Sequence, residues 1–252
     1  MHFRLRVWRA LRVGGAAVSF DLSDPAFLAA CQPRGFNPLS IPGCVFCLMA
    51  DGNVYTTGTT QATDGQTVET WENAGSGNDA TEATNKPTFK TNIINGLPVI
   101  RFDGVNDQLV TGTNTLTQPT MAFCVAKHNG SGSETLYAAG LNFLVEVNRT
   151  ANQLDLYPSP LKAGYTSGTF FQSTVLASGS SSQVWLNGSG SGTGSFTTSA
   201  GSDLKIGVWG SGSDPLSGDI AELIIYNALL SDAVREAVED YLGAKYGITI
   251  TH

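Results

Sequence analysis

Short runs with apolar side chains at every second position recur along the chain from about Leu39, and turn residues separate these runs at intervals of about 8 to 12 residues. Alternation with a period of two is typical of strands that bury one face, and this spacing is typical of two-sheet antiparallel sandwiches. Gly, Ser and Thr make up 77 of the 252 residues, whereas charged residues are only 14%. A helical bundle needs many more Lys, Glu and Arg on its exposed faces, so the chain is predicted to be all-β.

Two local signals refine this prediction. Asn187-Gly188 directly follows an apolar run and is the dipeptide that a two-residue β-hairpin turn prefers. Near the C-terminus the apolar period changes to that of a helix, with Ser231 as the N-cap and Gly247 as the left-handed residue that ends it. The predicted apolar stripe of this single C-terminal helix consists of Val234, Ala237, Val238, Tyr241 and Leu242.

The N-terminal segment differs from the rest. Four of the eight Arg lie in the first twelve residues, and apolar side chains alternate with them, as in an extended segment. We predict two parts: an N-terminal arm and linker at residues 1–38, with short helical or coil pieces from residue 13, and a domain at residues 39–252. Arg9 and Arg12 interrupt the apolar stretch that a signal peptide would need, so a non-secreted chain is expected. The predicted partner-binding residues of the arm are Phe3, Arg4, Leu5, Arg6, Val7, Trp8, Arg9 and Arg12.

The charge distribution and the lengths of the apolar runs argue against binding to nucleic acid and against a membrane span. The chain has a net charge of −7, and because the first acidic residue is Asp21, the part beyond the first twelve residues carries −11. So acidic a surface is unsuited to nucleic acid, which requires a basic face. No run of about 18 apolar residues occurs, so no membrane span is expected.

The order of motifs resembles one family. The run from SIPGCVFCLMAD through LPVIRFDGVNDQLV, and the closing run LSGDIAELIIYNALLSDAVREAVEDYLGAKYGI, resemble the start and end of LamG-like, concanavalin A-like jelly-roll domains over residues 39–249. The resemblance implies a two-sheet antiparallel jelly-roll sandwich with one C-terminal helix. Together with the basic arm, it is similar to domains of bacteriophage virion proteins.

From that resemblance we expect a non-enzymatic structural or attachment protein located in the virion, either a capsid decoration or a tail adhesin. Its arm would be anchored to other virion proteins or to copies of itself. The alternative is a free extracellular glycan-binding module whose partners are cell-surface glycans. A glycoside hydrolase is the third function considered.

The candidate catalytic residues are few. Laminarinase-type glucanases, which share the jelly roll, carry three carboxylates in an E-x-D-x-x-E pattern on one strand, and no such triplet occurs here. Asp219 and Glu222 are three residues apart, which would direct them to opposite faces of a strand. His128 lies in a Gly- and Ser-rich stretch without an evident partner acid. No catalytic residue is therefore predicted.

Asp103, Asn106 and Asp107 form the best cluster of oxygen ligands and are the candidate calcium site. The competing interpretation is a tight turn, because Asp-Gly and Asn-Asp tolerate positive φ and bond to their own backbone. Asp214 and Asp219 would complete a metal site if their loop lay beside this turn. No other cofactor is expected, since Cys44 and Cys47 form a lone C-x-x-C that suits strand thiols better than zinc.

Among the tryptophans, Trp209 is the candidate glycan-binding residue. It lies beside Gly210-Ser211-Gly212, and an exposed aromatic face can stack on the apolar face of a sugar. Trp71 and Trp185 have strand-like neighbours, so they are predicted to pack in the core or on a sheet surface.

Overall fold

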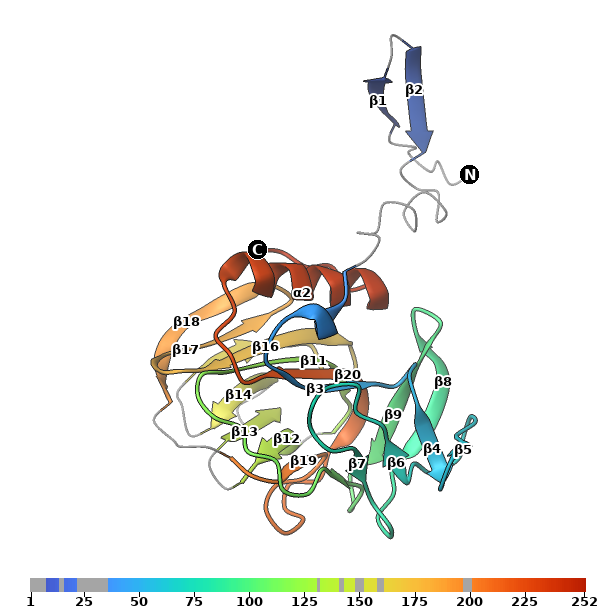
Figure 1. The fold of residues 1–252 in the computed structure, drawn as a ribbon, viewed down its shortest axis with the longest axis vertical. Helices are drawn as coiled ribbons and strands as arrows, with labels where there is room; N and C mark the ends of the chain where they lie inside the picture. Colours follow the sequence, from blue (N-terminus) through green and yellow to red (C-terminus); the bar gives the residue numbers. More distant parts are fainter. Residues whose placement is uncertain are drawn as a thin grey trace. The chain divides into compact units, whose positions relative to one another are not determined.

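The computed structural model describes residues 8–13, 16–21, 36–130, 132–140, 143–147, 152–157, 161–196 and 201–252. Contacts within the chain divide it into two units, Met1–Asn37 and Pro38–His252. Each unit has its own sheets, and the larger one contains the single described α-helix (Figure 1).

The first unit contains a two-stranded antiparallel sheet. Strand β1 (Trp8–Val13) pairs with β2 (Ala16–Asp21), so that Trp8 lies opposite Asp21. The prediction of only helical or coil pieces beyond residue 13 is wrong for β2, where Ala16, Val18 and Phe20 alternate as in a strand. Of the predicted docking residues, Phe3, Arg4, Leu5, Arg6 and Val7 lie outside the described residues, as do the side chains of Trp8, Arg9 and Arg12. Their docking role stays a prediction.

The second unit is a sandwich of two antiparallel sheets, which confirms the predicted all-β fold class. Among the described residues, the larger sheet has ten strands in the order β15-β14-β13-β12-β19-β10-β7-β6-β4-β5. Its strands are β4 (Val54–Thr57), β5 (Thr60–Gln61), β6 (Thr70–Trp71), β7 (Ala80–Thr81), β10 (Leu109–Val110), β12 (Glu134–Ala139), β13 (Phe143–Val147), β14 (Gln153–Tyr157), β15 (Lys162–Gly164) and β19 (Leu204–Ile206).

The smaller sheet has eight strands among the described residues, in the order β18-β17-β16-β11-β20-β9-β8, with β3 also paired to β20. Its strands are β3 (Cys44–Met49), β8 (Thr88–Ile94), β9 (Leu97–Asp103), β11 (Thr120–His128), β16 (Phe171–Ala177), β17 (Gly179–Leu186), β18 (Ser189–Phe196) and β20 (Ser217–Tyr226). A 3-10 turn, η1 (Pro38–Ser40), precedes β3. Strand β20 is bordered by β11 on one side and by β9 and β3 on the other.

The core lies between the two sheets, where the alternating apolar side chains of both meet. On β20 the core residues are Ile220, Leu223 and Ile225. Trp71 is fully buried and belongs to this core, as its strand-like neighbours predict. Trp185 is also almost fully buried, but it packs on the outer side of its sheet, against a helix.

Both local signals are confirmed. Asn187 and Gly188, each with positive φ (49° and 84°), join β17 to β18 in a tight hairpin. Helix α2 (Asp232–Tyr246) follows Ser231 and ends at Gly247, whose φ of 69° is left-handed. It is too short and too polar to span a membrane, and no other helix among the described residues could do so.

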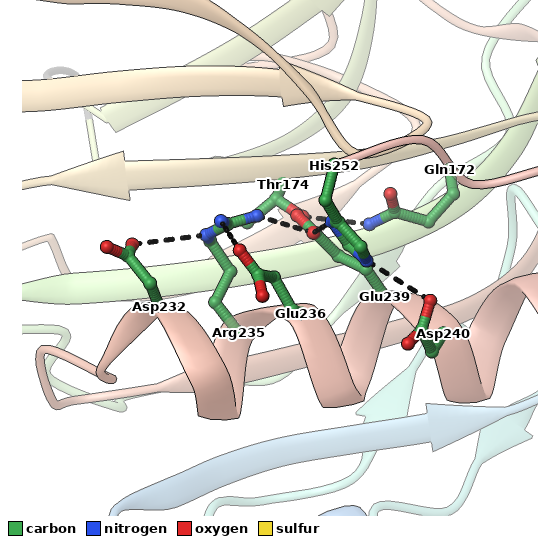
Figure 2. A network of polar contacts seen from close by, with 8 residues as sticks. All are labelled: Gln172, Thr174, Asp232, Arg235, Glu236, Glu239, Asp240 and His252. Carbon is green, nitrogen blue, oxygen red and sulfur yellow. Dashed lines mark hydrogen bonds and ion pairs between the residues drawn. The ribbon is translucent and has the colours of Figure 1, made fainter.

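Helix α2 covers the outer face of the smaller sheet over β11 and β16, and its buried face differs from the predicted apolar stripe (Figure 1). Val238 and Leu242 are buried as predicted, but Arg235 and Glu239 are buried beside them, whereas Val234 is only half-buried. The reason is the polar surface beneath the helix. The hydroxyl of Thr174 donates to Glu239 Oε1 at 2.6 Å (Figure 2). The Arg235 guanidinium lies 4.7 Å above the Trp185 ring.

Candidate functional site

Trp209 lies in the segment between β19 and β20, and its backbone is fixed by a pair of hydrogen bonds. The Trp209 N–H donates to the carbonyl of Ser213, and the Ser213 N–H donates to the carbonyl of Trp209, both at 2.9 Å. Gly210 and Gly212 have positive φ (57° and 112°), which lets the chain reverse within this short stretch. Lys205 Nζ donates to the carbonyl of Gly210 and ties the turn to β19. The indole is therefore presented by a turn with several backbone constraints.

Two hollows border Trp209, and its side chain lines both. The first has a volume of about 460 Å³ and is lined by Gly140, Ser202, Asp203, Lys205, Trp209, Gly210, Ser211 and Ser213. The second has a volume of about 230 Å³ and is lined by Ser133, Leu144, Glu146, Tyr157, Trp209 and Asp214. We call these the Trp209 hollows. They combine aromatic surface with hydroxyl, carboxylate and ammonium groups.

The Trp209 hollows lie on the outer face of the larger sheet. Lys205, Ala138, Leu144 and Tyr157 are neighbours across β19, β12, β13 and β14, and the residues beside them in each strand point into the core. The sequence does not reveal this row, since its members come from four strands.

A second row on the same face is polar and nearly buried. Thr135, Glu146 and Asp155 lie opposite one another across β12, β13 and β14, and Glu146 and Asp155 are only 3% and 2% exposed. Lys162 Nζ of β15 lies 3.4 Å from Asp155 Oδ2. Sequence reasoning missed these carboxylates because it searched for acids along one strand, and cross-strand partners are far apart in sequence. The available signal was a single acid inside each of two apolar strands.

The Trp209 indole carries an unused polar group. Its Nε1–H is buried and has no hydrogen-bond partner among the residues that the structure describes. A buried donor without a partner is costly. Because this N–H is buried, the half-buried ring offers a ligand its stacking face.

His128 lies at the end of β11, fully buried, and the prediction that it lacks a partner acid is wrong. Its Nε2 lies 3.0 Å from Glu134 Oε2, and its Nδ1 lies 2.7 Å from the Tyr165 hydroxyl. Glu134 Oε2 also accepts the Ser217 N–H at 2.7 Å. These contacts join the ends of β11, β12 and β20, and they lie outside the lining of the Trp209 hollows.

Asp219 and Glu222 lie on the same face of β20, contrary to the prediction. The register against β11 shifts at this point, with Val125 opposite Glu222 and Ala126 opposite Ile220. The extra residue of this β-bulge changes the alternation, so both carboxylates point away from the core. Burial raises the pKa of Glu222, while Lys245 Nζ at 2.8 Å opposes that rise.

The turn at residues 103–107, here the Asp103 turn, uses its carboxylates for its own backbone. Asp103 Oδ1 accepts the Val105 N–H at 2.8 Å, and Asp107 Oδ2 accepts the Asp103 N–H at 2.9 Å. Asn106 is exposed. Burial, together with the charge of Asp103, raises the pKa of Asp107 to about 6. These contacts agree with the turn interpretation, and calcium binding by Asp103, Asn106 and Asp107 stays a prediction.

The two acids considered as additional ligands have other environments. Asp214 lines the smaller Trp209 hollow, and Asp219 forms ion pairs with Arg101 and Lys127. The described residues contain no cluster of three or more His, Cys, Asp or Glu side chains suited to a metal ion.

Comparison with known proteins identifies the fold. No family model matches the chain, and no curated protein matches it in sequence. A Trypanosoma rangeli sialidase in complex with sialic acid matches with a TM-score of 0.56 and 16% identity, over 84% of this chain and 35% of the sialidase. A mutant of that sialidase displaying trans-sialidase activity gives a TM-score of 0.56 and 14% identity, over 83% of this chain and 34% of the mutant. Domain 4 of a GH43 extracellular arabinanase from Geobacillus stearothermophilus, in complex with arabinotriose, gives a TM-score of 0.47 and 14% identity, over 78% of this chain and 97% of that domain.

The sialidase similarity places the chain in the class of two-sheet β-sandwich domains, which is compatible with the concanavalin A-like resemblance in the sequence. At such identities the similarity shows the fold alone. The chain spans about a third of the length of the sialidases it matches.

Two functional predictions are corrected by these comparisons. We predicted a non-enzymatic structural or attachment protein of a bacteriophage particle. The matching structures are instead sialidases, which are enzymes that act on glycans. These comparisons contradict both the phage role and the prediction that the chain is not an enzyme, so neither is proposed further, nor is the virion location that depended on them.

Proposed function

We propose that the sandwich binds glycan chains in the Trp209 hollows, as part of a carbohydrate-active protein. The observation that carries the proposal is the position of Trp209, whose ring borders both hollows on a turn held by backbone hydrogen bonds. A fixed aromatic ring stacks on the apolar face of a sugar without losing much side-chain entropy. This corresponds to the alternative that we derived from the sequence, a glycan-binding module.

The polar groups around Trp209 suit the hydroxyls of a sugar. Asp203 and Lys205 line the larger hollow, and Glu146 and Asp214 line the smaller one. Carboxylates accept hydrogen bonds from sugar hydroxyls, and the Lys205 ammonium donates to them. A small number of such groups fixes the orientation of a ligand, while the aromatic ring supplies the contact area.

The comparisons support the ligand class. One of the matching sialidase structures is a complex with sialic acid. Because the chain corresponds to about a third of a sialidase, we assign it glycan recognition and treat catalysis as a separate question.

The test is a glycan-array screen of the whole chain, followed by titration calorimetry with the best ligand. Trp209→Ala should weaken binding at least tenfold, which corresponds to about 1.4 kcal/mol. Trp185→Phe is the matched control, because Trp185 packs against Arg235 on the other sheet, and its affinity should equal that of the wild type. If no glycan binds, or if Trp209→Ala binds as tightly as the wild type, the proposed site is wrong.

Glycosidic-bond hydrolysis is a second candidate function for the smaller hollow. Glu146 and Asp214 both line it, together with the rings of Tyr157 and Trp209. Two carboxylates beside a bound sugar are the minimum that most glycosidases use, one as the acid and one as the nucleophile or base. The assay is release of reducing ends from the glycans that bind. Activity that Glu146→Gln abolishes without loss of binding would support hydrolysis, and no release from any bound glycan would exclude this role.

A further inference from the structure

A further hollow, separate from the two Trp209 hollows, lies on the outer face of the smaller sheet. Thr88, Arg101, Asp219 and Lys127 are neighbours across β8, β9, β20 and β11, in that order. The residues that follow Arg101 and Asp219, Phe102 and Ile220, belong to the core, so this row points outward. The strands thus bring two cations together on either side of one carboxylate.

The Asp219 carboxylate forms ion pairs with two cationic side chains. Arg101 binds it through two parallel hydrogen bonds, Nε to Oδ1 at 2.6 Å and Nη2 to Oδ2 at 3.0 Å. Lys127 Nζ adds a third contact, at 2.8 Å from Oδ2. The bidentate pair with Arg101 already satisfies a buried carboxylate. The three side chains of Arg101, Asp219 and Lys127 together therefore carry a net charge of +1.

Both cations are accessible from solvent although Asp219 is not. The side chain of Arg101 is 39% exposed and that of Lys127 is 17% exposed, whereas Asp219 is fully buried. A guanidinium has five N–H donors, of which Asp219 takes two. The Lys127 ammonium also lies 4.9 Å from the centre of the Phe170 ring, which holds it in place. The remaining N–H groups can donate to a ligand.

The hollow above this row has a volume of about 620 Å³ and a mixed lining. It is lined by Thr88, Lys90, Arg101, Phe102, Asp103, Asp107, Lys127, Asn129, Ser217 and Gly218. The acids of the Asp103 turn can accept hydrogen bonds from hydroxyls. A ligand that carries one carboxylate and several hydroxyls satisfies both sides of the hollow.

We propose that this hollow, here the Arg101 hollow, binds a carboxylated sugar residue of a glycan chain. The sugar carboxylate accepts hydrogen bonds from Arg101 and Lys127, and its hydroxyls lie toward Asp103, Asn129 and Ser217. The proposal rests on the proposed function in taking the ligand to be a glycan. It adds the class of sugar and a second site on the opposite sheet.

The test compares trigalacturonic acid with its methyl ester, in which a neutral methyl ester replaces each carboxylate. Calorimetry with the whole chain should show the acid binding at least tenfold more tightly than the ester. Lys127→Gln should reduce acid binding at least fivefold and leave ester binding unchanged. Lys90 also lines the hollow, where its ammonium attracts the sugar carboxylate, and it contacts the exposed Asp64 at 3.1 Å. Lys90→Gln should therefore also weaken acid binding and leave ester binding unchanged, and it keeps the test valid if Lys127→Gln does not fold.

Lys86→Gln is the matched control, because Lys86 pairs with Glu69 at 2.7 Å and does not line the Arg101 hollow. It should bind the acid as the wild type does. Equal affinity for acid and ester, no binding of either, or unchanged acid binding in folded Lys127→Gln and Lys90→Gln would overturn the proposal. Trp209→Ala separates the two sites. If Trp209→Ala no longer binds neutral glycans but still binds the acid more tightly than the ester, both the Trp209 site and the Arg101 hollow are supported. If it loses neutral-glycan binding and shows no preference for the acid, only the proposed function is supported.

Discussion

Replacing Arg235 by Met should destabilise the sandwich unit strongly, because it leaves a buried charge without its main partner. Arg235 Nη1 donates to Glu239 Oε2 in a contact of 2.5 Å, and Glu239 is fully buried under α2 (Figure 2). Glu239 would keep the Thr174 hydroxyl at 2.6 Å and His252 Nδ1 at 3.3 Å. Removing one partner of a buried ion pair costs about 3 to 5 kcal/mol. For a unit of this size, that lowers the melting temperature by about 6 to 20 °C.

The pH dependence identifies the cause of the loss. Burial raises the pKa of Glu239, and the Thr174 hydroxyl and Arg235 oppose the rise. Without Arg235 the folded state therefore binds a proton that the unfolded state releases, and stability falls as the pH rises from the ordinary glutamate value through the folded pKa. The deficit relative to wild type should be larger at pH 8 than at pH 4.5. Lost packing alone would give a deficit independent of pH.

Urea unfolding followed by circular dichroism measures these differences, with two further variants. Arg235→Met combined with Glu239→Gln removes both charges and keeps an acceptor for Thr174, so it should recover most of the lost stability at pH 8. Glu236→Gln removes a partly exposed contact of Arg235 at 3.0 Å and should change stability by less than about 0.5 kcal/mol. A loss below about 1 kcal/mol for Arg235→Met, or equal losses in the single and double variants, would refute the reasoning.

Three shorter predictions concern the Asp103 turn and the glycines near Trp209. Gly207→Ala should lower the free energy of unfolding, measured in urea, by about 2 to 4 kcal/mol, because the φ of Gly207 is 86° and an added Cβ would collide with the Phe102 ring. Gly210 also has a positive φ, but no atom lies near the position of an added Cβ, so Gly210→Ala should lower the free energy of unfolding by only about 1 kcal/mol. The pKa of Asp107 in the folded state is about 6, above its unfolded value of about 4, so the wild type loses stability as the pH rises between these values. Asp107→Asn should therefore stabilise the protein by on the order of 1 kcal/mol at pH 7 and have little effect at pH 3.5. If the Asp103 turn binds calcium, millimolar calcium should raise the melting temperature above that in chelator, and identical melting curves would favour the turn interpretation.

Much of the sandwich could be predicted from local pattern. Alternation identifies strands such as Ser217–Tyr226, and the dipeptide Asn187-Gly188 defines its hairpin because only a few residues tolerate positive φ. Strand Ala16–Asp21 was missed because Gly and Pro nearby outweighed its short alternation. The two-residue strands Thr70–Trp71 and Ala80–Thr81 have no periodicity to detect, since their pairing depends on distant neighbours.

The sites were less predictable because they depend on which strands are neighbours. The position of Trp209 in a Gly-rich turn could be read from the sequence, but the opposition of Glu146 and Asp155 requires the register of β13 against β14. The common face of Asp219 and Glu222 requires a bulge that no local signal announces. Arg101 and Asp219 were not linked for the same reason, as they come from strands far apart along the chain.

The pairing of β20 has a consequence for how the chain folds during synthesis. Strands β3, β9 and β11 precede β20 in the sequence, and each of them pairs with β20. The ribosome therefore synthesises all three before it reaches the end of β20 at Tyr226. Until then the smaller sheet lacks its central member, and the nascent chain exposes the edges of three apolar strands. Pairing between such distant segments makes folding slow and leaves the incomplete chain prone to aggregation. The sandwich is therefore expected to become stable only after nearly all of it has been translated.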